Sequence, residues 1–249
     1  MKSIQNYEVL SNEYLALDIY KMVLKGDSSW ITNPGQFVNI TIENAYLKRP
    51  ISICDWDENS ITIIYKVVGF GTKQLSQKKV GDVIECLVGL GNGYDVENIN
   101  EPVLVVGGGV GVPPIYGLAK SLVKKGVDVT AILAFNGQEN AFYLKEFEDL
   151  GVKLHVCTMD GSLGTKGFAS DVMKNENLCD VLYMVCGNVP MMQSVFKASN
   201  HNGFLSFEER MGCGFGACMG CSCKTLTGYK RICKEGPVMK SEEILWTKD

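Results

Sequence analysis

Apolar and polar residues alternate along the first 97 residues in short runs, separated by turn-forming residues. The runs cover residues 7–10, 14–23, 36–42, 50–54, 61–67 and 83–87, with turn signals at 33–35 and 81–82. Alternation with a period of two is typical of half-buried strands, and six short strands at this spacing favour an antiparallel barrel or sandwich. We therefore predict a β-barrel domain over residues 1–97, with one short helix at 73–77.

The pattern changes near residue 102, where apolar runs begin to alternate with stretches of helical periodicity. The runs cover residues 103–106, 129–135, 152–157 and 181–186, and the helical stretches 115–125, 141–150, 168–174 and 190–199. Strands that alternate with helices in this way build a parallel, doubly wound sheet. We predict an α/β domain over residues 98–205 and a third, small module rich in Gly and Cys over residues 206–249.

Composition excludes several classes of protein. The chain has 249 residues, 46% of them apolar, and a formal charge of −4 without a basic block, so nucleic acid is not an expected partner. The first residues contain no apolar signal segment, and the longest uncharged stretch, 102–119, is interrupted by Gly and Pro and is too short to cross a bilayer. We expect a soluble protein. Ten cysteines without a secretory signal indicate a reducing compartment, the cytoplasm.

Five of the ten cysteines lie within 21 residues. Four of them have the C-x4-C-x2-C…C spacing of a plant-type [2Fe–2S] cluster: Cys213, Cys218, Cys221 and Cys233. A structural zinc site is the alternative, but zinc prefers two paired C-x2-4-C knuckles and this segment offers one. The fifth, Cys223, falls outside the spacing, and we expect it to point away from the metal.

Glycines around these cysteines let the backbone curl tightly and turn amide N–H groups toward sulfur. Residues 222–226 and 229–233 are predicted as two strands joined at Thr227 and Gly228. Such a hairpin would return Cys233 to the other three ligands.

A glycine-rich turn follows the first apolar strand of the α/β domain. It contains Gly107, Gly108, Gly109 and Gly111, and Pro113 and Pro114 begin the next helix. Backbone amides and a helix N-terminus would meet there, which suits a pyrophosphate, although a plain tight turn has the same appearance. Cys186 and Gly187 end the last clear strand and would leave room for the same ligand, or would be a buried Cys before an ordinary turn.

The segment after the second strand of this domain bears on the choice of nucleotide. NADPH would call for Arg or Lys near residues 135–140, to bind the 2′-phosphate. The sequence instead has Glu139 and no cation before Lys145. This favours NAD(H).

Three segments of the barrel are candidates for a second nucleotide. The first is Arg49, Pro50, Ile51 and Ser52, which combines a forked cation with a hydroxyl group. The second is Ile64, Tyr65 and Lys66, in which Tyr65 could stack on a ring or simply pack in the core. The third is Gly71 and Thr72, whose amides could face a phosphate and whose Thr is placed to cap the short helix.

Taken together, the order of these motifs resembles the ferredoxin–NADP reductase superfamily. The segment 208–223, EERMGCGFGACMGCSC, narrows the resemblance to the electron-transfer subunits of NAD-dependent (class 1B) dihydroorotate dehydrogenase. The resemblance covers essentially the whole chain. It implies that the barrel segments hold FAD, the four cysteines the cluster, and the α/β domain NAD.

The same resemblance implies a partner. An FMN-bearing catalytic subunit would oxidise dihydroorotate to orotate in pyrimidine synthesis, in a heterotetramer of two subunits of each kind. Electrons would pass from FMN through the [2Fe–2S] cluster and FAD to NAD+, and we expect the cluster to face the partner. A related reductase that serves ferredoxin or sulfide shares every motif and is the alternative, and a zinc-stabilised binding module is a third possibility.

Overall fold

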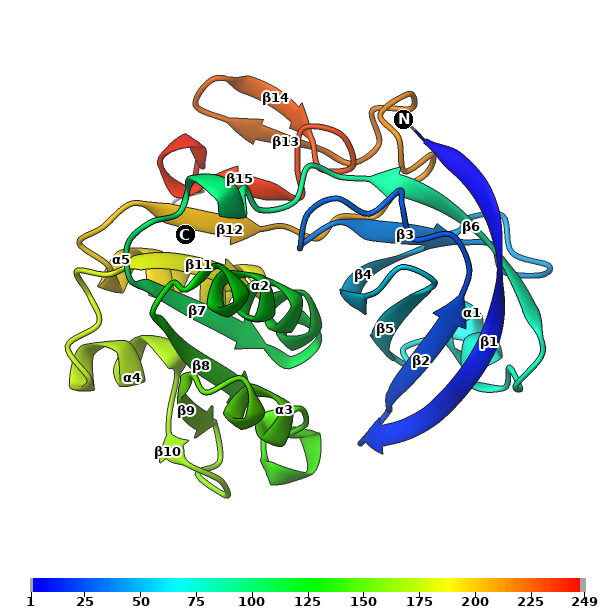
Figure 1. Cartoon of the computed structure of the whole chain (residues 1–249). Helices are drawn as coiled ribbons and strands as arrows, with labels where there is room; N and C mark the ends of the chain where they lie inside the picture. The colour runs from blue at the N-terminus through cyan, green and yellow to red at the C-terminus, as the bar shows by residue number, and fades with distance from the viewer. Residues whose placement is uncertain (1, 247–249) are drawn as a thin grey trace.

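The computed structural model describes residues 2–246, which form two lobes with a small module across the top (Figure 1). The first lobe is a closed antiparallel barrel in the order β1-β2-β5-β4-β3-β6. Its strands are β1 (Ser3–Ala16), β2 (Ile19–Lys25), β3 (Phe37–Ile40), β4 (Arg49–Trp56), β5 (Ser60–Lys66) and β6 (Val83–Leu90), with α1 (Phe70–Ser76) between β5 and β6. The predicted barrel is confirmed.

The first hairpin of the barrel differs from the prediction. Residues 14–23 were expected as one strand, but the chain turns at Leu17 and Asp18, where Asp18 has a φ of 59°. The expected break near residue 12 is absent because Asn12 stays in β1 and donates its amide to the carbonyls of Leu75 (2.9 Å) and Lys78 (3.0 Å). Asn12 interrupts the apolar pattern of the sequence, but in the structure it remains in the strand and contacts residues far away in the sequence.

The second lobe contains a seven-stranded sheet in the order β10-β9-β8-β7-β11-β12-β15, in which β15 alone runs antiparallel to its neighbour. Its strands are β7 (Val103–Gly108), β8 (Val129–Phe135), β9 (Lys153–Thr158), β10 (Thr165–Lys166), β11 (Leu182–Cys186), β12 (Gly203–Ser206) and β15 (Val238–Lys240). Its helices are α2 (Val112–Lys125), α3 (Leu144–Asp149), α4 (Ala169–Asn175) and α5 (Val189–Ala198). The doubly wound α/β prediction is confirmed.

Alternate residues of the central strands build two separate cores. Val105, Leu133 and Met184 pack with α2 on the face toward the barrel, whereas Leu104 and Ile132 pack with α4 and α5 on the other face. Strands buried on both faces explain the continuous apolar runs of the sequence. The helix predicted at 141–150 is shorter, because Tyr143 has a φ of 65° and helical geometry begins only after it.

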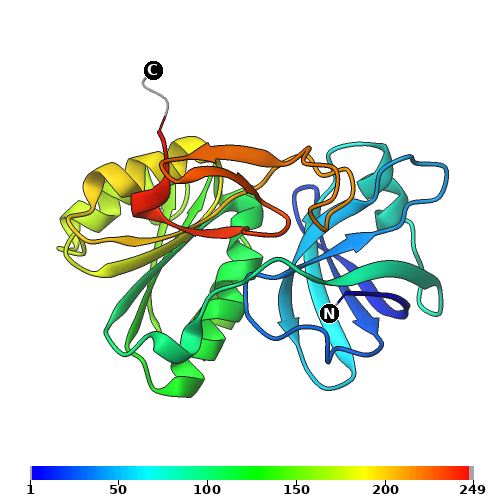
Figure 2. The same cartoon turned by 90° about the horizontal axis from the view of Figure 1, so that it is seen from above.

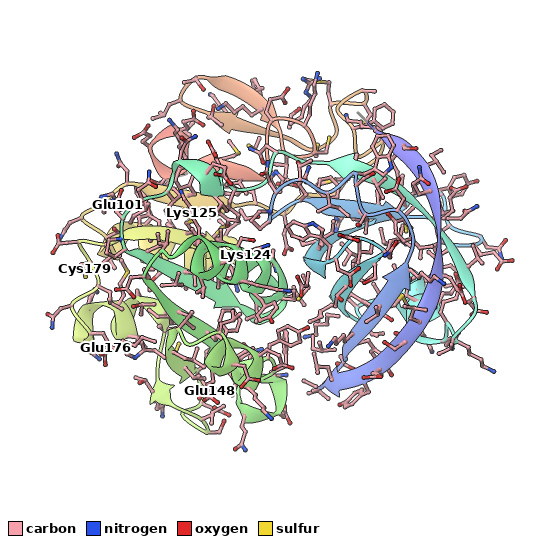
Figure 3. All side chains as sticks on the ribbon, in the orientation of Figure 1. Glu101, Lys124, Lys125, Glu148, Glu176 and Cys179 are labelled. Atoms are coloured by element: carbon pink, nitrogen blue, oxygen red, sulfur yellow. The ribbon has the colours of Figure 1, made fainter. Side chains whose placement is uncertain are left out.

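Four short 3-10 helices accompany these elements within residues 2–246. They are η1 (Val96–Asn98), η2 (Gly109–Gly111), η3 (Gln138–Asn140) and η4 (Ser241–Glu243). The first lies in the connection between the lobes. There Lys125, at the end of α2 (Figure 3), donates to the carbonyls of Val96 (2.9 Å) and Ile99 (2.6 Å). The connection is thereby tied to the α/β domain.

Helix α2 packs directly on the barrel. A Cβ atom added at Gly117 would lie 2.5 Å from the carbonyl oxygen of Cys54, so only glycine permits this approach. Lys120 pairs with Asp55 at 2.5 Å beside it. The two lobes are thus fixed against each other by backbone contact and by charge.

The module after β12 crosses from the α/β domain to the barrel (Figure 2). Its hairpin consists of β13 (Ser222–Thr225) and β14 (Gly228–Arg231), close to the predicted strands. The chain then returns to the sheet as β15, which sequence reasoning missed because the strand has three residues and follows Pro237. The domain limits at 97/98 and 205/206 stay a prediction, and β15 shows that the third module shares the sheet of the second. In residues 2–246 no helix is long and apolar enough to cross a membrane.

Candidate functional site

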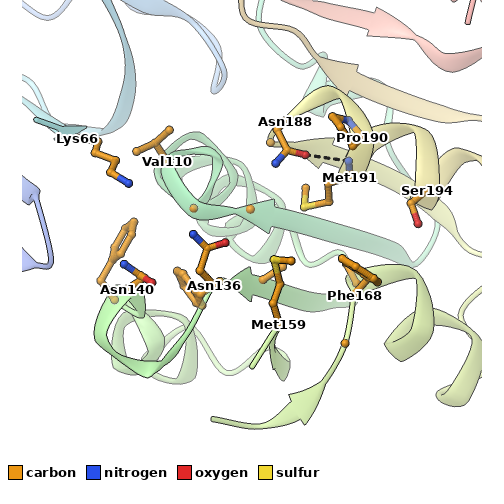
Figure 4. A pocket seen from close by; sticks show the side chains of 18 of the residues that line it. Lys66, Val110, Asn136, Asn140, Met159, Phe168, Asn188, Pro190, Met191 and Ser194 are labelled. Atoms are coloured by element: carbon orange, nitrogen blue, oxygen red, sulfur yellow. Dashed lines mark hydrogen bonds between the residues drawn. The ribbon is translucent and has the colours of Figure 1, made fainter. Parts of the chain in front are cut away.

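A cavity of about 600 Å³ lies where the parallel strands end (Figure 4). Four neighbouring strands contribute to its wall: Gly108 at the end of β7 with Gly109 and Val110 after it, Asn136 after β8, Met159 after β9, and Asn188 and Met191 after β11. The carboxyl edge of an open parallel sheet is where such folds bind nucleotides. Asn188 is the N-cap of α5, and its side chain accepts a hydrogen bond from the N–H of Met191 (2.9 Å). We call this space the sheet cavity.

The predicted glycines divide into two groups. Gly108, Gly109 and Gly187 border the sheet cavity, as expected of a loop that receives a ligand. Gly107 and Gly111 do not line it; a Cβ at Gly111 would lie 2.1 Å from the carbonyl oxygen of Cys186. Gly111 therefore lets the start of α2 approach β11, while Gly107 lets it approach β7, because a Cβ at Gly107 would lie 2.9 Å from Val112 Cα.

Cys186 likewise does not line the sheet cavity. It is buried, and burial raises the pKa of its thiol to about 12. Its small side chain leaves room for the loop, but the thiol does not line the cavity. Cys186 is therefore a buried residue before a turn, which is the alternative that the sequence left open.

The barrel has a second cavity, of about 310 Å³, which we call the barrel cavity. Eight of the nine predicted barrel residues line it: Arg49, Pro50, Ile51, Ser52, Ile64, Tyr65, Lys66 and Thr72. The ninth, Gly71, lies against Arg49, since a Cβ there would be 2.6 Å from the Arg49 Nε. The three predicted segments therefore meet around one space.

Of the two interpretations kept open for Tyr65 the structure supports core packing, and it corrects the capping position predicted for Thr72. The Tyr65 ring belongs to the barrel core, stacks on Tyr20 at a centroid distance of 6.0 Å, and donates its hydroxyl to Asn12 (2.9 Å). Core packing thus occupies the ring that might have stacked on a cofactor. Thr72 does not begin the helix, which starts at Phe70; its Oγ1 accepts from the N–H groups of Val68 (3.0 Å) and Gly69 (3.3 Å).

The two cavities share three wall residues, which sequence reasoning did not link. Lys66 comes from the barrel, Val110 from the loop after β7, and Glu208 from the chain after β12. Glu208 is exposed to solvent at the surface of the two cavities, but the protein walls around its carboxyl group partly desolvate it and raise its pKa. Ligands in the two cavities would meet at these residues.

The cysteine loop turns its backbone amides toward sulfur. Cys213 Sγ accepts from the N–H groups of Phe215 (3.5 Å), Ala217 (3.2 Å) and Cys218 (3.4 Å). Burial would raise the pKa of Cys213, but these amides outweigh it and bring the pKa down to about 6. A thiolate at this position is what a metal ligand requires.

The four predicted ligands form two pairs. The N–H of Cys213 lies 3.5 Å from Cys218 Sγ, and the N–H of Cys233 lies 3.5 Å from Cys221 Sγ. Cys221 and Cys233 are buried, while Cys218 is exposed and Cys213 half-buried. In residues 2–246 no three of His, Cys, Asp or Glu are grouped as ligands of a single ion. Two thiols for each of two irons is the ligand set of a [2Fe–2S] cluster, which these pairs fit.

The hairpin places Cys233 as expected. Ile232 donates its N–H to the carbonyl of Cys221 (3.1 Å), which brings the two buried cysteines together. Cys223 points elsewhere and lies 4.0 Å from Met239 Sδ. Arg231 connects β14 to the cysteine loop. Its guanidinium group pairs with Glu235 and donates a hydrogen bond to the carbonyl of Gly216 (2.7 Å).

The buried cysteine pair adjoins the barrel cavity. Cys221 and Cys233 pack in one cluster with Phe37 of β3 and with Met211. The same Phe37 and Met211 line the barrel cavity. Neither residue carries a sequence signal, because their role follows from the packing of the module on β3.

Comparison with known proteins agrees with this arrangement. Residues 208–245 match the iron-sulfur cluster binding domain of dihydroorotate dehydrogenase B. The chain is 43% identical over 255 residues to the "Dihydroorotate dehydrogenase B (NAD(+)), electron transfer subunit" of Fusobacterium nucleatum, covering 97% of this chain and 98% of that one. The chain belongs to this family of electron transfer subunits.

Further relatives support the assignment. The subunit of the same name from Geobacillus sp. is 42% identical, with 98% of this chain and 100% of that one covered. A solved structure of an NADH-dependent reduced ferredoxin-NADP oxidoreductase superposes with a TM-score of 0.87 at 29% identity, over 96% of this chain and 90% of that one. The resemblance inferred from the cysteine segment is confirmed.

Proposed function

We propose that the chain passes electrons from the FMN of a dihydroorotate dehydrogenase catalytic subunit, through a [2Fe–2S] cluster and FAD, to NAD+. One observation carries the proposal: the three sites adjoin in a single series. The buried cysteine pair shares Phe37 and Met211 with the barrel cavity, and the barrel cavity shares Lys66, Val110 and Glu208 with the sheet cavity.

The residues available at each site suit one group. Cys213, Cys218, Cys221 and Cys233 would hold the cluster, and residues 49–52, 64–66 and 71–72 would hold FAD, with Arg49 as the cation for its phosphates. The sheet cavity would hold NAD+ on the amides near Gly108, Gly109 and Gly187. NAD exchanges two electrons as a hydride and the cluster one at a time, and a flavin between them exchanges either number.

NAD fits the sheet cavity better than NADP. Of the described residues that line it, Lys66 is the one cation, and it lies at the junction with the barrel cavity. Asn136 and Asn140 take the place where a cation for a 2′-phosphate would be expected. We therefore propose NAD+ as the acceptor.

The partner would bind over Cys213 and Cys218, the less buried pair of cysteines. Beside Cys218, the side chains of Phe215 and Met219 are 42% and 52% exposed, which places apolar surface around the cluster. Lys2 donates to the carbonyl of Phe215 (2.7 Å) and holds the loop at this face. We propose that the catalytic subunit covers this surface, two copies of each chain forming the complex. The ten free cysteines suit a reducing cytoplasm.

Reconstitution tests the proposal directly. The pure chain, loaded with iron, sulfide and FAD, is mixed with the catalytic subunit, dihydroorotate and NAD+, and NADH is followed by its absorbance. We expect NADH formation that requires both chains, and a far lower rate with NADP+. Cys221→Ser should abolish it and Cys223→Ser, the matched control, should not. No NADH formation by the loaded pair of chains would refute the function.

A further inference from the structure

Asn39 is a buried polar residue that neither the fold nor the proposed electron path has used. It lies in β3 with a side-chain exposure of 0%, and neither its Nδ2 nor its Oδ1 has a hydrogen-bond partner within the described chain. Buried amides are nearly always paired, because burying one without a partner costs free energy. A partner for this amide is therefore expected from outside the polypeptide.

Strand geometry directs Asn39 toward the cysteine module. Val38 and Ile40 belong to the barrel core, so Phe37 and Asn39 face outward on the same side of β3. Phe37 packs with Cys221 and Cys233. Asn39, one pleat further along, faces the same module.

The amide meets the cluster loop at Gly214. A Cβ added to Gly214 would lie 2.5 Å from Asn39 Nδ2, and this glycine has a φ of 76° between Cys213 and Phe215. On its own strand ladder Asn39 pairs with Pro50, within the segment proposed for FAD. Its side chain thus lies against the loop that would hold the first pair of ligands, and its strand neighbour Pro50 lines the barrel cavity.

We propose that Asn39 donates a hydrogen bond from its Nδ2–H to a sulfur atom of the cluster. This rests on the proposed function, because it requires the cluster to be bound. Sulfide and thiolate sulfurs accept hydrogen bonds and donate none, so they suit the NH2 end of the amide. An N–H dipole directed at sulfur stabilises the reduced, more negative cluster and raises its reduction potential. Asn39 is then a residue that sets the potential of the cluster, and it has no part in ligation.

Isotope labelling tests this in the wild-type complex without any mutation. Asparagine carrying 15N at its side-chain nitrogen alone is incorporated, the holoenzyme is reduced, and pulsed EPR records nuclear couplings to the cluster. The last asparagine in the sequence is Asn202, so the whole segment from the first to the last cysteine ligand adds no label. We expect a 15N coupling. A reduced-cluster EPR signal without such a coupling would overturn the assignment, whereas no cluster signal at all would refute the proposed function instead.

A variant then identifies the residue. Asn39→Leu keeps the approximate volume and removes the donor, so the coupling should disappear while two irons per chain remain. The equilibrium between reduced and oxidised cluster should shift about tenfold toward the oxidised form, which is about 59 mV for a one-electron couple. Asn59→Leu, at an exposed position of the same barrel, is the control and should retain both the coupling and the potential. A coupling that persists in Asn39→Leu, or an unchanged potential with the cluster in place, would contradict the proposal. Should this variant fail to fold, the wild-type coupling still decides.

Discussion

The two glycine-rich loops of this chain use glycine for different purposes. In the loop after β7, Gly111 faces the backbone of Cys186, so the shape of the loop is imposed by a buried sheet. In the cysteine loop, Gly214 and Gly216 have φ values of 76° and 89° and lie against the side chains of Asn39 and Lys234. The first loop is formed by the fold itself. The second is shaped by tight turns and sulfur-directed amides, and we expect the cluster to complete it.

The largest expected effect is the loss of the cluster on replacing Cys221, a proposed ligand in the second loop. Replacement of the neighbouring Cys223 should not have this effect. Cys221→Ser removes a buried ligand, so the cluster should be lost and NAD+ reduction with dihydroorotate should fall to the background rate. Cys223→Ser should retain both, because its thiol lies beside Met239. Iron content and NADH formation measure the outcome, and equal losses in both variants would contradict the assignment of ligands.

The next effect concerns the first loop. Gly111→Ala places a Cβ into the Cys186 carbonyl, and the free energy of unfolding should fall by about 3 kcal/mol. Gly69→Ala is the matched control, because its extended backbone accepts alanine and no atom lies within 4 Å of the new Cβ. Its unfolding free energy should change by less than about 0.5 kcal/mol in urea titrations. If Gly111→Ala changed the free energy of unfolding as little as Gly69→Ala does, the loop after β7 would not be fixed by the sheet behind it.

Removing the cluster should distinguish the loops within one molecule. After chelation of iron, amide hydrogen exchange should become about tenfold faster or more across residues 213–221, while β7 and α2 keep their protection. Mass spectrometry of the two forms measures this by peptide. Equal changes in both loops would mean that the first also depends on the metal.

A smaller effect on stability is expected from the ion pair between Arg231 and Glu235, next to the cysteine loop. Hydrogen bonding to Arg231 lowers the pKa of Glu235 to about 2, from an ordinary 4.5. Because the folded pKa is depressed, the stability from this pair is present above pH 4.5 and is lost as the pH falls toward 2. Arg231→Met should therefore destabilise the metal-free chain near neutral pH, and the difference should shrink in acid.

Urea titrations over that pH range test the pair, with Lys153→Met as control. Lys153 pairs with Glu176 at 3.4 Å on the surface and touches neither loop. Its loss should have little effect on unfolding at any of these pH values. A difference between Arg231→Met and wild type that does not change with pH would exclude the ion pair as its cause.

The smallest effect is expected at Glu208, where the walls of the two cavities meet. The surrounding walls partly desolvate this solvent-exposed carboxyl and raise its pKa, so its contribution to stability is full below pH 4.5 and is lost as the pH rises through the folded pKa. Glu208→Gln should raise the Tm near pH ~7 by about 2 °C or less, with no gain in acid. Thermal unfolding at the two pH values measures it, and a lower Tm near pH ~7 would contradict the desolvation of this carboxyl.

Sequence alone identified the features that depend on local spacing. The predicted ligand set rested on the spacing of the cysteines in the sequence. The hairpin that brings Cys233 back toward the other ligands was predicted from the turn residues Thr227 and Gly228. The barrel segments at Arg49 and Gly71 were proposed because phosphate binding favours a forked cation and free backbone amides.

Other features depend on contacts between distant segments and left no local signal. The buried Asn39 and the contact between Phe37 and the cysteine pair require β3 to lie under the module. Glu208 reaches both cavities only because β12 ends beside them. For the ring of Tyr65 the sequence left cofactor stacking and core packing open, and the structure places the ring in the barrel core.

The central claim is that one chain connects a cluster and a flavin to NAD. Anaerobic titration of the purified holoprotein with NADH, with iron, zinc and flavin quantified, tests it most directly. The account predicts two irons and one FAD per chain, with loss of flavin absorbance and appearance of the EPR signal of a reduced [2Fe–2S] cluster on adding NADH. Zinc in place of iron, or a flavin that is reduced by NADH while the cluster stays oxidised, would contradict it.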